Sequence, residues 1–73
     1  MNVVATGKIK GTEIEFDVVS TGGGLILDWQ ARNEAEKGIL MDMIGFERAL
    51  SAALDSDDGV GERKGVIVSV VYL

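Results

Sequence analysis

Hydrophobic and polar residues alternate along the first twenty positions, with one interruption. Small or apolar residues occupy the odd positions 3 to 9, and apolar residues occupy the even positions 14 to 18, where three acids alternate with them. A period of two is typical of a β-strand with one face on the core. Gly11-Thr12 lies between the two runs and is typical of a two-residue type II′ turn. The pattern therefore predicts a β-hairpin.

The register of this hairpin follows from the turn. With Gly11-Thr12 as the loop, opposite charges meet on one face and apolar residues meet on the other. The predicted pairs are Lys10 with Glu13, Ile9 with Ile14, Lys8 with Glu15, Gly7 with Phe16, and Ala5 with Val18. A slip of one residue would destroy both sets of pairs. We also expect the ring of Phe16 to cover the bare backbone of Gly7.

The remaining pattern predicts two more strands and one helix. Thr21 to Gly24 reads as a flexible connection, and a third strand runs from Leu25 to about Ala31. Asn33 is a good helix N-cap, with Glu36 three residues later. Apolar residues then recur at spacings of three and four, which predicts a helix over 34–54. The stripe consists of Ala35, Ile39, Met43, Phe46, Leu50 and Ala53.

Two glycines leave an alternative open within this helix. Gly38 and Gly45 each cost about 1 kcal/mol in a helix interior. Residues 38–45 could instead form a short strand, with the helix starting near Phe46. Residues 55–61 read as a loop, and Val66 to Leu73 as the last strand.

These elements predict a single α+β domain over residues 1–73. Its small four-stranded sheet is antiparallel or mixed, with one helix packed on one face, in the order β-β-β-α-β. A right-handed crossover would place the last strand beside the first and parallel to it.

The last strand is apolar on both of its faces. A strand that is covered on one side should alternate with polar residues, and one helix cannot cover both faces of a sheet. We therefore expect the outer face of this strand to form an interface between copies of the chain, with a central buried strand as the alternative. The interface residues would be Ile67, Ser69, Val71 and Leu73.

The composition excludes several kinds of catalytic and metal-binding site. The chain has no Cys and no His, which excludes disulfides, thiolate metal sites and histidine acid–base catalysis. Its acids miss the spacing of a calcium loop, because the sixth position counted from Asp55 is Val60 where a glycine is required. We expect no enzymatic activity, no metal and no cofactor. The N-terminus resembles no signal peptide, so we expect a cytoplasmic protein.

Twelve acids and seven bases give a net charge of −5. This charge opposes binding to nucleic acids and to anionic membranes, and it favours a protein partner with a basic surface. The first candidate contacts are Asp55, Asp57, Asp58 and Glu62, and a second set is Glu13, Glu15 and Asp17. Acids are unfavourable at a helix C-terminus, which makes the first set unusual. The alternative is an ordinary solvated loop.

The small size, the acidity and the lack of catalytic side chains resemble the small proteins with which phages block host enzymes, including anti-CRISPR and DNA-mimic inhibitors. This resemblance is one of class and rests on no specific motif. It implies a protein-binding inhibitor that occludes a basic, nucleic-acid-binding surface, in the host cytoplasm if a phage encodes it. A structural subunit that assembles through its last strand is the alternative function.

Overall fold

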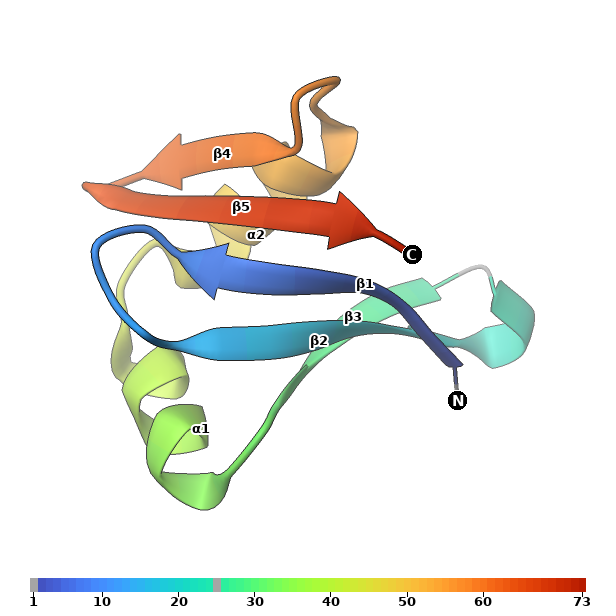
Figure 1. The fold of residues 1–73 in the computed structure, drawn as a ribbon, viewed down its shortest axis with the longest axis horizontal. Helices are drawn as coiled ribbons and strands as arrows, with labels where there is room; N and C mark the ends of the chain where they lie inside the picture. Colours follow the sequence, from blue (N-terminus) through green and yellow to red (C-terminus); the bar gives the residue numbers. More distant parts are fainter. Residues whose placement is uncertain (1, 25) are drawn as a thin grey trace.

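The computed structural model describes residues 2–24 and 26–73, which form one antiparallel sheet and two helices (Figure 1). The strands are β1 (Asn2–Ile9), β2 (Glu15–Thr21), β3 (Ile26–Ala31), β4 (Val60–Arg63) and β5 (Val66–Tyr72). The helices are α1 (Glu34–Asp42) and α2 (Phe46–Asp55), and a 3-10 turn spans Gly22–Gly24. The predicted start of the third strand, Leu25, lies outside the described residues. The α+β class is therefore confirmed, although the sheet has five strands where four were predicted.

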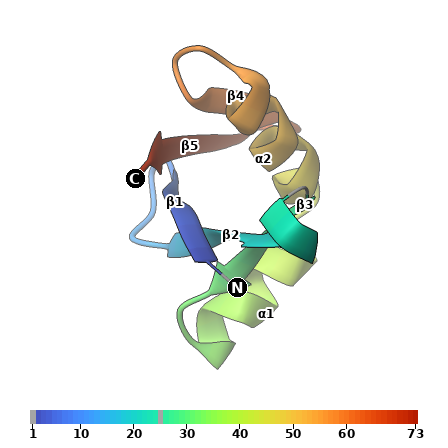
Figure 2. The ribbon, with the colours of Figure 1, turned by 90° about the vertical axis from the view of Figure 1, so that its right-hand side faces the viewer.

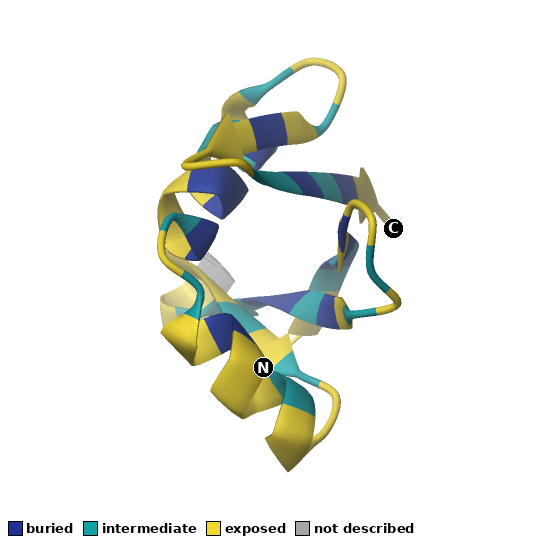
Figure 3. Ribbon diagram, turned by 90° about the vertical axis from the view of Figure 1, so that its left-hand side faces the viewer, coloured by how far each residue is buried: buried dark blue, intermediate teal, exposed yellow. Residues whose placement is uncertain are grey.

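The sheet has the order β3-β2-β1-β5-β4 and is curled, with α2 on its open side. Figure 2 shows α2 between the two ends of the curled sheet, β4 and β3. Helix α2 packs on β4 and β5, while α1 contacts β3. Figure 3 shows buried residues on the strands and on both helices. One surface of the curl therefore faces the helices, and the opposite surface faces outward.

The register predicted for the hairpin is confirmed. Lys8 pairs with Glu15, and Gly7 pairs with Phe16. The predicted two-residue turn is wrong, because the connection covers residues 10–14 and the N–H of Thr12 donates to the carbonyl of Ile9 (3.1 Å). The longer loop keeps the predicted register, and the N–H of Ile9 donates to the carbonyl of Ile14 (3.2 Å). The predicted pair of Lys10 with Glu13 is not formed, because both residues lie within the loop. Near the start of β1 a β-bulge shifts the register between residues 3 and 5.

The single helix predicted over 34–54 is two helices, separated at residues 43–45. The side chain of Asn33 accepts a hydrogen bond from the N–H of Glu36 (2.8 Å), as expected of the N-cap. The break lies at Gly45, whose φ of 94° is left-handed and favours glycine. Gly38 lies within α1 and does not form a strand. The break changes the direction of the helical stripe, so Ile39 is half exposed instead of buried.

The last strand lies beside β1 as predicted, but it runs antiparallel to it. The predicted parallel arrangement is wrong because an additional strand, β4, forms a hairpin with β5 and reverses the chain. Gly61 of β4 is buried directly under α2. A Cβ atom at this position would come within 3.0 Å of the carbonyl oxygen of Ala49, the backbone nitrogen of Ala53 and the Cβ of Ala52. The helix and the strand therefore approach each other through small residues.

Three aromatic rings connect the sheet to α2. Phe16 and Phe46 are fully buried, and their ring centroids lie 5.1 Å apart in an edge-to-face arrangement. Trp29 of β3 meets Phe46 at the same distance and in the same arrangement. A Cβ atom on Gly7 would overlap the Phe16 ring, which confirms that the ring covers this glycine. The aromatic contacts hold β3 close to the start of α2.

Candidate protein-binding surfaces

The loop after α2 holds the acids that the sequence indicated, and one of them stabilises the loop itself. The Oδ1 atom of Asp58 accepts hydrogen bonds from the hydroxyl of Ser56 and from the N–H of Val60, the latter at 3.0 Å. The hydrogen bonds from Ser56 and Val60 lower the pKa of Asp58. Asp58 therefore has a structural role that explains its place after the helix.

The other three acids of the first set differ in their surroundings. Asp55 ends α2 and Asp57 lies in the loop, and both are exposed. Glu62 lies on β4, where its Oε2 atom accepts a hydrogen bond from the N–H of Gly65 in the β4–β5 turn (2.9 Å). The structure thus places Asp55 and Asp57 in one short segment, while Glu62 is engaged by the next turn along the chain.

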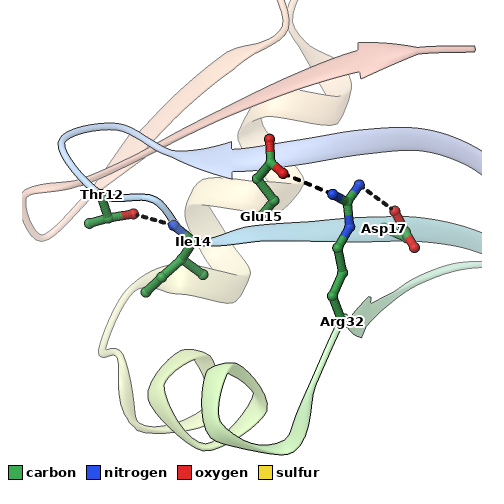
Figure 4. Close-up of polar contacts among 5 residues, drawn as sticks. All are labelled: Thr12, Ile14, Glu15, Asp17 and Arg32. Atoms are coloured by element: carbon green, nitrogen blue, oxygen red, sulfur yellow. Dashed lines mark hydrogen bonds and ion pairs between the residues drawn. The ribbon is translucent and has the colours of Figure 1, made fainter.

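The second set of acids is bound largely by an arginine that sequence reasoning did not select (Figure 4). Arg32 donates to Glu15 through Nη1 (2.8 Å) and to Asp17 through Nη2 (3.0 Å). The hydrogen bond with Asp17 is the main cause that raises the pKa of Arg32. Glu13 is exposed in the turn. The β2–β3 register sets Ala31 opposite Phe16 and so brings Arg32 to these acids, but that register was not read from the sequence.

The outward surface of β5 carries the residues predicted for an oligomer interface. Ile67 and Ser69 are half-buried, whereas Val71 and Leu73 are 66% and 79% exposed. Val3, which pairs with the buried Val19, is also exposed. An apolar stripe therefore lies at the end of β5.

Sequence reasoning missed a groove between β3 and α2. It has a volume of about 330 Å³, and its lining residues are Leu27, Asp28, Trp29, Glu47, Leu50, Ser51, Leu54 and Asp55. Three of these are acids and none is basic. The indole Nε1 of Trp29 donates to Oε2 of Glu47 across the groove (3.3 Å). The separate acids at positions 28, 47 and 55 carry no local motif, and only the tertiary fold brings them to one groove.

A second, larger groove lies on the α1 side of β3. Its volume is about 980 Å³, and it continues from the first groove past Asp28 and Trp29. Four basic residues and three acids line it, so its charge is mixed. Met41 and Ile44, 66% and 77% exposed, provide apolar surface there.

No protein-family model, curated protein or solved structure matches this chain. Among residues 2–24 and 26–73, no group of three or more potential metal ligands is found. None of the helices in this described part is long and apolar enough to cross a membrane.

Proposed function

We propose that this protein is a small acidic module that binds another protein and inhibits it by covering a basic, nucleic-acid-binding surface. The observation that carries the proposal is the acidic groove between β3 and α2. Asp28, Glu47 and Asp55 line it, none of its lining residues is basic, and the exposed Asp57 follows in the adjacent loop. A surface of this kind complements the lysines and arginines with which proteins bind phosphates.

The charge of the whole chain supports the same proposal. A net charge of −5 repels nucleic acids and anionic membranes, and it attracts a basic protein surface. The proposed inhibitor acts by occupying this surface, without catalysis and without a cofactor. It would act in the cytoplasm, and in the host cytoplasm if a phage encodes it, as the resemblance to small phage inhibitors implies.

The test is capture of the partner from the native host, followed by binding measurements at several salt concentrations. The variant Asp55→Asn with Asp57→Asn should bind about tenfold more weakly at low salt, because contact charges steer and select the partner. Asp58 is left unchanged because it stabilises the loop. The matched control is Glu34→Gln with Asp42→Asn, which removes two exposed acids of α1.

Equal affinity of the variant and the wild type at every salt concentration would contradict the role of Asp55 and Asp57. Wild-type affinity should also decrease steeply as salt rises, since salt screens exposed charges. Both variants should keep the unfolding temperature of the wild type, because exposed acids contribute little to folding.

A second candidate function is self-assembly through the outward surface of β5. The exposure of Val71 and Leu73 favours it, since contiguous apolar surface often marks an interface. The variant Val71→Lys should then reduce the mass measured by sedimentation. A wild-type protein that stays monomeric at high micromolar concentration would overturn this alternative.

A further inference from the structure

Strand β3 forms one end of the sheet and presents an outer edge. Its neighbour is β2, and no other strand of the described part pairs with it. The N–H of Trp29 donates to the Oδ1 atom of Asp28 (2.8 Å). Hydrogen-bonding groups alternate in direction along a strand, so the N–H groups of Leu27 and Ala31 point to the same outer edge. An edge of this kind is a template for another strand, and a charge such as Asp28 is a common guard against unwanted pairing.

Residues along this edge border two grooves. Leu27, Asp28 and Trp29 line the acidic groove, and the residues from Asp28 to Ala31 line the larger groove. The other edge strand, β4, has four residues, and its Arg63 carbonyl lies close to Gly45. Strand β3 has six residues and is the longer of the two edges.

The charged residues of the groove on the α2 side of the edge are all acidic and favour a cationic occupant. On the α2 side, Glu47 and Asp55 lie with Leu27 and Leu54 around one groove. The side chain of an arginine or lysine could lay its aliphatic stem on the leucines and direct its charge to the carboxylates. A second copy of this chain is disfavoured, because pairing of two β3 strands would bring the Asp28 side chains and the acidic grooves of both copies together.

From the proposed function, we infer that the partner presents an extended segment rich in arginine or lysine, and that this segment adds to the outer edge of β3 as a sixth strand. Its carbonyl groups accept from the edge N–H groups, including that of Trp29, and Asp28 then pairs with a cation of the segment. Its inward side chains, which alternate along the strand, enter the groove between β3 and α2. Backbone pairing gives affinity and the acids give selectivity, as in other cases of strand addition.

The probe is a six-residue peptide of alternating arginine and valine, matched in length to β3 and blocked at both ends. Binding is followed by the fluorescence of Trp29, the one tryptophan of the chain. Hydrogen exchange should slow at the N–H groups of Leu27, Trp29 and Ala31. The two control probes are the same peptide with N-methyl groups on alternate residues, at the odd positions in one and at the even positions in the other. N-methylation keeps the charge but removes the N–H groups that pair along a strand edge.

The unmethylated peptide should bind, and the variant Glu47→Gln with Asp55→Asn should weaken it about tenfold. Glu36→Gln with Asp42→Asn, two acids of α1 outside both grooves beside β3, should leave its affinity unchanged. At least one of the two methylated peptides should lose most of the affinity.

Equal affinity of all three peptides would overturn strand addition. The proposed function would survive that result if the acidic variant still weakened binding of each peptide. Absence of binding by the unmethylated peptide would also overturn the inference, as would protection of the β3 edge by self-association of the protein alone. The salt-dependent capture of a partner tests the proposed function separately.

Discussion

Gly61 provides a sharp test of how closely α2 approaches the sheet. The variant Gly61→Ala places a Cβ atom within 3.0 Å of two backbone atoms of α2, the carbonyl oxygen of Ala49 and the nitrogen of Ala53. Backbone atoms cannot rotate away as a side chain can, so the helix must move away from β4. Gly38→Ala is the matched control, because Gly38 is exposed within α1 and a Cβ atom there would meet nothing within 4 Å.

The two substitutions should have opposite effects on the free energy of unfolding. Overpacking of a buried site lowers the free energy of unfolding by up to about 3 kcal/mol. Replacing glycine by alanine also reduces the entropy of the unfolded chain, which raises the free energy of unfolding by up to about 1 kcal/mol. Gly61→Ala should therefore lose about 2 kcal/mol, which lowers the melting temperature by roughly 8–16 °C in a domain of this size. Gly38→Ala should gain up to about 1 kcal/mol from helix propensity, or roughly 4–8 °C.

Circular dichroism during heating and during urea titration measures both variants. The slope of the urea transition should stay unchanged, since both variants should unfold to the same extent. An unfolding temperature of Gly61→Ala at or above that of the wild type would refute the close contact between α2 and β4.

Three further predictions concern the hairpin, its arginine and the acidic loop. Gly7→Ala should lower the free energy of unfolding by about 2 kcal/mol, because its Cβ atom would displace the Phe16 ring; wild-type stability in urea would contradict this. Arg32→Leu should cost at most about 1 kcal/mol, since its ion pairs are exposed, and a cost that persists at high salt would argue against an electrostatic cause. The lowered pKa of Asp58 means that its stabilising contribution is complete above the ordinary pKa of Asp, about 4, and is lost as the pH falls through the lower folded value. The difference in stability between the wild type and Asp58→Asn should therefore shrink in acid, and a difference that is independent of pH would contradict the bonds from Ser56 and Val60.

The hairpin could be predicted because its determinants are local. Lys8 and Glu15, like Gly7 and Phe16, are brought together by a short loop, and several pairs agree on one register. The loop length was wrong, and only the pair nearest the turn, Lys10 with Glu13, was lost, because the longer loop keeps the same register. Because several residue pairs support one register, the error in the loop length did not make the predicted register wrong.

The strand β4 could not be read from the sequence because it lacks an alternating pattern. Its buried position is Gly61, which has no side chain, and its other residues are exposed. The break before α2 was indicated by Gly45, but the helical spacing continues through it and favoured one helix. The conformation with positive φ at Gly45 is fixed by packing against β4, where the Arg63 carbonyl leaves no room for a Cβ atom.

The residues of the acidic groove could be predicted from the sequence only in part. Asp55 was selected from the local sequence, whereas Asp28 and Glu47 join it only because the sheet curls and brings β3 to α2. The acids of the hairpin were selected without their partner, because Arg32 reaches them through the pairing of β2 with β3.

The central claim is that this protein competes with nucleic acid for one basic surface of its partner. The direct measurement is the fluorescence anisotropy of a labelled oligonucleotide bound to the captured partner, while this protein is titrated in. The wild type and the variant Glu34→Gln with Asp42→Asn should displace the oligonucleotide equally, and Asp55→Asn with Asp57→Asn should need about ten times more protein. A stable complex that holds the partner, the oligonucleotide and this protein together would contradict the claim.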